Sequence, residues 1–175
     1  IIYNIRNRAS PLLVSIYNLT DFQSQGMVLS KNEKTLYLFG TSINIPAQKK
    51  VQVFDVSNLQ TPKLLSSMNF NQTAKSIDSM QLNPEGSMLY IGFSNGLLMV
   101  DVRIPTQPVL FGYYYFPDEM DAIKLANNAN LIYAVSSTRV TAFDIAAQYI
   151  LHLKNNDFKI GGSYPITLNV LKMNK

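Results

Sequence analysis

The chain has 175 residues and a formal net charge of +4, with 47% hydrophobic and 15% charged residues. This composition is typical of one folded globular domain and excludes a disordered chain. The basic residues are scattered, so neither a nucleic-acid-binding stripe nor a polybasic membrane patch is predicted. There is no cysteine, which excludes disulfides, thiolate chemistry and cysteine zinc sites. Every apolar run is far shorter than the ~20 residues of a membrane-spanning helix.

Two sequence units alternate along the chain. In the first unit, an Asn or Asp stands seven residues before a Pro. In chain order it occurs at Asn4–Pro11, Asp55–Pro62 and Asp101–Pro108, and a fourth copy keeps Asp144 but has Leu151 at the Pro position. The second unit, a Leu eight residues before a Tyr, lies between them at Leu29–Tyr37, Leu82–Tyr90 and Leu125–Tyr133. Two independent spacings that recur three times establish an internal repeat.

The repeat length, taken between successive Asn or Asp positions, is 51, 46 and 43 residues. The longest copy carries an insertion, "TSINIPAQKK", over residues 41–50. The sequence does not show whether this insertion is a binding loop or a tolerated excursion.

The stretch from Ser79 to Tyr115 shows what one repeat contains. Short apolar runs over residues 79–82, 87–93, 97–102 and 109–115 are separated by "NPEG", "SNG" and "RIPTQP". Pro, Gly and Asn at such places reverse the chain, so the pattern predicts a four-stranded antiparallel meander and an all-β fold. Residues 97–100 are apolar at successive positions, which predicts a strand covered on both faces.

These units resemble the β-propeller superfamily, and most closely the propellers built from LVIVD repeats. The resemblance is carried by "LLMVDV" (97–102), "VQVFDV" (51–56), "TAFDI" (141–145), the element "TQPVLFG" (106–112), and the hairpins "LNPEGSMLYIG" and "LSKNEKTLYLFG". It implies a propeller segment over residues 1–153, with repeats near 1–50, 51–96, 97–139 and 140–153. That amounts to about three and a half blades, whereas closed propellers usually have about 4–8. The sequence begins in the middle of a blade, so we expect a fragment of a longer chain.

The tail over residues 154–175 has a different pattern. "YPITLNVLK" alternates between apolar and polar residues from Tyr164, as a half-exposed strand does. Two interpretations stay open. The tail resembles the closing strand of an immunoglobulin- or cadherin-like module, and it equally suits an atypical terminal blade strand.

Carboxylates in register suggest a metal site. Asp78 and Asp121 each stand four residues before the Leu of the second unit, and Gln25 takes this place in the first copy. In a propeller these positions open the innermost strand, so the three side chains are weak candidates for binding Ca²⁺ at a channel mouth. The favoured alternative is that they cap turns and solvate the channel. The only histidine, His152, makes a catalytic triad or His-rich metal site untenable in this segment.

Several repeated residues have structural explanations. Asp55, Asp101 and Asp144 interrupt apolar strands, so each is expected to accept hydrogen bonds from the backbone of the following loop. The repeated tyrosines at 37, 90 and 133 suit packing between blades. Four successive aromatic residues form a possible docking patch that equally suits internal packing: Tyr113, Tyr114, Tyr115 and Phe116.

Two N-glycosylation sequons begin at Asn18 and Asn71, each in a loop after a predicted outermost strand. They favour an extracellular or cell-surface setting. We therefore expect a non-catalytic scaffold that presents loops and blade edges to protein partners or to further domains of the same chain, without nucleic acid, a membrane span or a cofactor. Two alternatives stay open: a lactonase- or hydrolase-like propeller enzyme with a channel metal, and an intracellular subunit of a large assembly.

Overall fold

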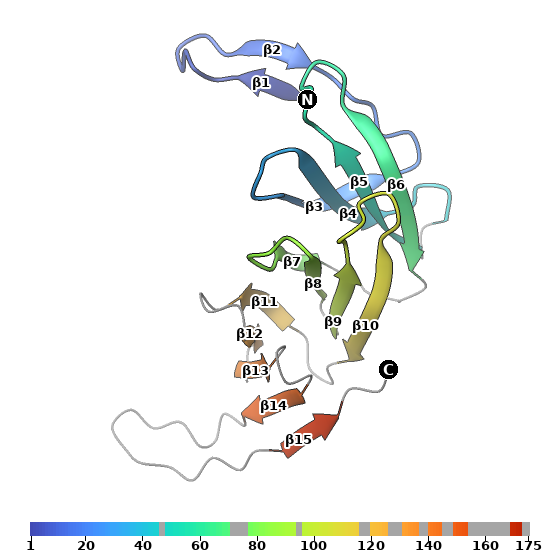
Figure 1. Cartoon of the computed structure of the whole chain (residues 1–175), viewed down its shortest axis with the longest axis vertical. Helices are drawn as coiled ribbons and strands as arrows, with labels where there is room; N and C mark the ends of the chain where they lie inside the picture. Colours follow the sequence, from blue (N-terminus) through green and yellow to red (C-terminus); the bar gives the residue numbers. More distant parts are fainter. Residues whose placement is uncertain are drawn as a thin grey trace. The chain divides into compact units, whose positions relative to one another are not determined.

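A computed structural model describes residues 1–45, 48–70, 77–93, 96–115, 120–125, 131–136, 140–144, 149–153 and 169–172. All regular elements in these residues are β-strands, which confirms the predicted all-β class (Figure 1). No helix among them is long and apolar enough to cross a membrane. The chain divides into two compact units: residues 1–73 with 102–108, and residues 74–101 with 109–175.

The first unit holds a two-stranded and a four-stranded antiparallel sheet. The two-stranded sheet pairs β1 (Ile2–Asn4) with β2 (Leu12–Ser15). The four-stranded sheet runs in chain order through β3 (Gln23–Leu29), β4 (Thr35–Thr41), β5 (Lys49–Asp55) and β6 (Lys63–Phe70). This is the predicted meander.

The second unit holds two further antiparallel sheets, each again in chain order. One is formed by β7 (Ile77–Leu82), β8 (Met88–Phe93), β9 (Gly96–Asp101) and β10 (Val109–Tyr115). The other is formed by β11 (Met120–Leu125), β12 (Leu131–Ser136), β13 (Val140–Asp144), β14 (Tyr149–Leu153) and β15 (Asn169–Lys172). The tail therefore contributes β15 as a fifth strand, which pairs with β14.

The core lies on the middle strands of each sheet. In β9, residues 96–100 are buried at every position, as their unbroken apolar run predicts. In β8, residues 89–93 are likewise buried throughout. Gly96 is required there because a Cβ would lie 2.3 Å from the carbonyl oxygen of Tyr114. Burial on both faces is what stacked sheets demand, since each sheet covers its neighbours.

Two kinds of β-bulge recur at equivalent places in the repeat. On the first strand of three sheets, one extra residue stands opposite the second strand: Gln25 in β3, Asp78 in β7 and Asp121 in β11. On the last strand, the extra residues are Val14 in β2, Leu65 in β6 and Phe111 in β10. The repeat thus extends from residue spacing to irregularities of strand pairing, and β1 and β2 correspond to the third and fourth strands of a complete sheet.

Candidate functional site

The three residues that the sequence singled out for a metal site are the three bulged residues of the first strands. Asp78 and Asp121 are both the second residue of their strand, and β11 lies beside β7 within the second unit. A bulge leaves its extra residue out of the ladder and redirects its side chain, which is why bulges are common beside functional sites. The repeat therefore places Gln25, Asp78 and Asp121 at equivalent backbone positions.

The side chain of Gln25 belongs to a short polar chain at the end of its sheet. Its Oε1 accepts a hydrogen bond of 3.2 Å from the Thr41 hydroxyl, which in turn accepts one of 3.0 Å from Lys49 Nζ. Lys49 is only 5% exposed, and burial lowers the pKa of its ammonium group. The amide oxygen of Gln25 is thus already engaged by a neighbour in its own sheet.

The insertion over residues 41–50 is anchored through Asp21. Lys50 forms an ion pair with the Asp21 carboxylate, while the Ser42 hydroxyl and the Asn44 backbone N–H each donate to it at 3.1 Å. The hydrogen bond from Lys50, followed by that from Asn44, lowers the pKa of the Asp21 carboxyl. These bonds hold the described part of the insertion, and they leave the side chains of Ile43 and Ile45 exposed.

Metal binding has limited support in these residues. Among the residues that the structure describes, no three His, Asp or Glu side chains come together in a way that could hold a metal ion. The side chains of Asp78 and Asp121 lie outside the described part, so Ca²⁺ binding there stays a prediction. The same holds for the side chain of His152, of which the structure gives only the pairing with Thr141 and Asn169.

At two of the repeated positions, the Asn or Asp side chain caps the loop that follows it. The Asp55 carboxylate accepts a hydrogen bond of 2.9 Å from the Ser57 N–H, and Asn4 accepts one of 3.0 Å from the Arg6 N–H. Hydrogen bonding by the Ser57 side chain, followed by that from the Ser57 backbone, lowers the pKa of the Asp55 carboxyl. This confirms the structural role expected for Asp55. It is partly exposed, however, because it is the last residue of β5.

The tyrosines behave differently from one another. Tyr37 and Tyr90 are buried, whereas Tyr133 is 38% exposed. In the aromatic run, Tyr113 and Tyr114 are half-buried near the end of β10. The Tyr113 ring lies 6.3 Å from that of Phe93, and burial raises the pKa of the Tyr114 hydroxyl.

The rest of the aromatic run, the Tyr115 side chain and Phe116, lies outside the described residues. The two rings that are described favour internal packing over the docking patch. Of the two sequons, Asn18 is exposed in the loop between β2 and β3, and Asn71 lies outside the described residues.

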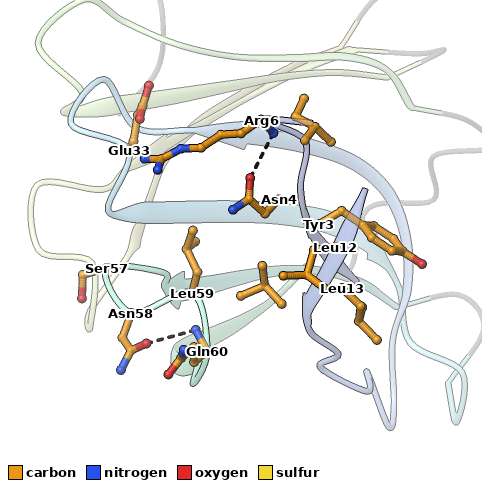
Figure 2. Close-up of a pocket in the computed structure, with 12 residues that line it drawn as sticks. Tyr3, Asn4, Arg6, Leu12, Leu13, Glu33, Ser57, Asn58, Leu59 and Gln60 are labelled. Atoms are coloured by element: carbon orange, nitrogen blue, oxygen red, sulfur yellow. Dashed lines mark hydrogen bonds between the residues drawn. The ribbon is translucent and has the colours of Figure 1, made fainter. Parts of the chain in front are cut away.

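An open groove that was not predicted lies in the first unit, beside β1. It has a volume of about 1080 Å³ and is lined by β1, β2 and the turns at Glu33 and residues 57–60 (Figure 2). Tyr3, Leu12, Leu13 and Leu59 give it an apolar wall, and Figure 2 shows Arg6 and Glu33 at one rim. The signal that could have revealed it was the half repeat itself, since in the described residues β1 and β2 form a two-stranded sheet, whereas the other sheets have four or five strands.

Comparison with known families identifies one repeat directly. The model of the LVIVD repeat matches residues 78–115, which include β7 from its second residue and all of β8, β9 and β10. The sheets before and after this match, β3–β6 and β11–β15, are also antiparallel and run in chain order, and both carry the bulge on their first strand. The chain is a β-propeller segment that carries an LVIVD repeat. A comparison with curated proteins gives no match.

Solved structures agree with this fold. A candidate 6-phosphogluconolactonase from Bacteroides fragilis matches with a TM-score of 0.65 and 14% identity, over 89% of this chain and 44% of that one. A second candidate 6-phosphogluconolactonase, from Bacteroides uniformis, matches with a TM-score of 0.57 and 16% identity, over 89% and 43%. Hydrazine synthase from Kuenenia stuttgartiensis matches with a TM-score of 0.57 and 16% identity, over 78% and 37%. The segment therefore spans less than half of each of these chains, and identities this low show the fold alone.

Proposed function

We propose that this propeller segment is part of a non-catalytic scaffold that binds other proteins, within a larger extracellular or cell-surface protein. The observation that carries the proposal is a repeated leucine on the outermost strands. Leu13, Leu64 and Leu110 occupy the same place in β2, β6 and β10, and their side chains are 47%, 44% and 39% exposed. A repeat that keeps a large apolar side chain in solvent on a stiff sheet offers equivalent anchor points for a partner.

The edge strand β10 exposes further apolar side chains of its own. Val109 and Phe111, on either side of Leu110, are 60% and 49% exposed, and Phe111 is the bulged residue of the strand. A bulge lets neighbouring side chains project from the same edge. Three consecutive exposed apolar residues on an edge strand are costly for a chain without a partner, because such edges promote aggregation. Residues 109–111 therefore replace the tyrosine run as the favoured docking surface.

The extracellular setting has one point of support, the exposed sequon at Asn18 in the loop between β2 and β3. The test is the intact mass of the protein from its native source before and after enzymatic removal of N-glycans. Loss of mass at a peptide that contains Asn18 supports a surface glycoprotein. An unmodified Asn18 contradicts the extracellular setting and favours an intracellular assembly.

The scaffold function is tested by partner binding with matched variants. Proteins crosslinked to the segment in its native setting are compared for the wild type, Phe111→Asp and Thr106→Asp. Thr106 is an exposed polar loop residue, so its variant controls for added charge. We expect partners to be lost with Phe111→Asp and retained with Thr106→Asp. Equal crosslinking by all three would contradict the proposal for this surface.

A second candidate function is a hydrolase with a channel cation. It is favoured by the equivalent bulges at Asp78 and Asp121 on adjacent strands, and two of the structural neighbours are candidate 6-phosphogluconolactonases. The assay is hydrolysis of 6-phosphogluconolactone with and without Ca²⁺. Cation-dependent turnover that Asp78→Asn and Asp121→Asn both abolish would replace the scaffold proposal.

A further inference from the structure

The outermost strands β6, β10 and β14 differ in what lies beside their outer edge. Among the described residues, β6 and β10 are the last strands of their sheets, and each pairs with one strand only. β14 is paired on both sides, with β13 and with β15. β15 comes from the tail and lies beyond the four strands that one repeat supplies. The fold thus contains one outermost strand that has already accepted a fifth strand.

Strand pairing aligns the three outermost strands residue by residue. The residue opposite the repeated Asp at the end of the third strand is Lys63 in β6, Val109 in β10 and Tyr149 in β14. Past the bulge, β6 has Ser66 where β10 has Gly112. A lysine on an edge strand is one means by which proteins prevent unwanted strand pairing. β6 therefore carries this protection at its edge, whereas β10 and β14 do not.

β10 combines the unprotected sequence of β14 with the open edge of β6. No residue of β10, over 109–115, is charged. At its start Val109, Leu110 and Phe111 are 60%, 39% and 49% exposed. An exposed apolar edge strand without charges is a template to which an extended segment adds by strand pairing. The equivalent edge of β14 shows the outcome, because a strand occupies it.

We propose that the outer edge of β10 binds an extended segment of a partner protein as a fifth antiparallel strand. The segment has the chemistry of β15, in which two adjacent apolar residues, Val170 and Leu171, stand between Asn169 and Lys172. The proposal rests on the proposed scaffold function, because it states how a partner is held at residues 109–111. Main-chain hydrogen bonds supply the affinity, and the apolar side chains select the partner.

The pairing of β14 with β15 gives the expected register. Leu171 stands opposite Ile150, which corresponds to Leu110 of β10. We therefore expect an apolar residue of the partner opposite Leu110, while the bulged Phe111 stays outside the new ladder. The residue after Leu171 in β15 is a lysine, so a basic residue of the partner lies opposite Val109.

The probe is a synthetic peptide with the sequence of residues 166–175, which contains β15. It is titrated against the chain while amide hydrogen exchange is followed over residues 109–115. We expect binding to slow exchange in β10.

Two N-methylated forms of the peptide are the matched pair, one methylated at residues 169 and 171 and the other at residues 170 and 172. Successive residues of a strand direct their N–H groups to opposite edges, so one form blocks the edge that faces β10 and the other leaves that edge intact. We expect one form to bind about tenfold or more weakly than the other.

One substitution gives β10 the protection that β6 has. Val109→Lys places a lysine where β6 has Lys63, opposite the lysine of the peptide, and we expect binding to weaken about fivefold or more. A peptide with Lys172→Glu should recover binding to this variant, because opposite charges then face each other. Val109→Thr is the uncharged control and should leave binding unchanged. Val109 is 60% exposed, so neither substitution disturbs a packed core.

Three outcomes would overturn the proposal. The first is no protection in β10 at about 1 mM peptide, or protection confined to residues 149–153, where the peptide would replace β15. The second is equal binding by the two N-methylated peptides, because side chains and not the backbone would then hold the peptide. The third is a dimer in sedimentation that Val109→Lys dissociates, because a second copy of this chain would then occupy the edge.

These results are separate from the test of the scaffold function, which compares crosslinked partners of the wild type and Phe111→Asp. Loss of partners with Phe111→Asp, together with equal binding of the two N-methylated peptides, would keep the scaffold and reject strand pairing. Unchanged crosslinking with Phe111→Asp, together with protection of β10 by the peptide, would reject the scaffold at this surface and keep an edge that pairs with a strand.

Discussion

The Ser66 hydroxyl donates a hydrogen bond of 2.7 Å to the carbonyl oxygen of Pro105, which lies 39 residues further along the chain. The Ser15 hydroxyl makes the equivalent bond to the carbonyl oxygen of Leu59. In each case a serine on the last strand of one repeat holds the loop of the next repeat, and the bond from Ser66 explains why residues 102–108 belong to the first unit. In the next copy this position is Gly112, which has no side chain to make the bond.

Ser66→Ala tests the contribution of this bond. It leaves a partly buried carbonyl oxygen without its donor, and we expect a loss of about 1 kcal/mol in the free energy of unfolding of the first unit. Urea denaturation measures the loss. Ser67→Ala, at the exposed neighbouring position, is the control and should change stability by less than about 0.5 kcal/mol. Equal effects of the two variants would mean that the bond contributes nothing.

Two equivalent turns, each between the first and second strands of a sheet, differ in whether glycine stands at the position with positive φ. Glu33 and Gly86 occupy equivalent turn positions with φ of 59° and 71°, and each N–H donates to the carbonyl three residues earlier, at Ser30 or Asn83. A residue with a side chain in this left-handed region destabilises the folded state by about 1–2 kcal/mol, and glycine avoids this strain. Part of that gain is offset because glycine has more conformational freedom in the unfolded state.

We therefore expect Glu33→Gly to stabilise the first unit by about 0.5–1 kcal/mol, and Gly86→Ala to destabilise the second by about 1 kcal/mol. Thermal and urea unfolding give both values. Lys31→Gly is the control, since Lys31 lies in the same turn with an ordinary φ, and glycine there should destabilise. If Glu33→Gly and Lys31→Gly destabilise alike, the argument from φ is wrong.

The ion pair between Asp21 and Lys50 predicts sensitivity to acid. The hydrogen bonds to Asp21 lower its pKa from 3.8 in the folded chain. A lowered folded-state pKa gives stability that is fully present above about pH 4 and is lost as the pH falls through the folded value. We expect Asp21→Asn to be less stable than the wild type at pH 7 and to lose less stability on acidification. The check is the urea midpoint between pH 7 and pH 2.5.

A double-mutant cycle isolates the pair. In a Lys50→Met background the carboxylate has lost its main partner, so Asp21→Asn should then have a smaller effect than in the wild type. Asp55, whose pKa is also lowered, retains its own share of the acid sensitivity in every variant. An effect of Asp21→Asn that is the same in both backgrounds would show that the ion pair does not cause the pH dependence.

The repeat made the blades predictable, because spacing and turn residues recur in the sequence. The Leu-to-Tyr spacing predicted the first two strands of each sheet, and the Asn or Asp before Pro predicted the end of the third strand. The sequence also showed that Gln25, Asp78 and Asp121 are equivalent. It did not show that each is a bulged residue, because a bulge is defined by how a strand pairs with its neighbour. The groove at Tyr3 was not predicted, because the exposure of a strand residue depends on which side chains pack over it. The tyrosine run left two explanations open because strand alternation permits both, and the contact between the rings of Tyr113 and Phe93 favours packing.

Burial of Tyr90 predicts a loss of stability in alkali. Burial, and to a smaller extent the charge of Glu85, raises the pKa of Tyr90 from 10.0 to about 12. Because the folded-state value is the higher one, this contribution to stability is fully present below pH 10 and is lost as the pH rises from 10 toward 12. Tyr90→Phe has no phenol to ionise, so its stability relative to the wild type should increase over that interval.

The measurement is the urea midpoint of both proteins between pH 8 and pH 11.5. Difference absorbance of the phenolate in the folded proteins provides an independent readout of the ionisation. Glu85→Gln removes the charge that helps to raise the pKa of Tyr90, so its phenolate signal should begin at a slightly lower pH than in the wild type. If wild type and Tyr90→Phe lose stability in parallel above pH 10, ionisation of Tyr90 does not cause the loss of stability in alkali.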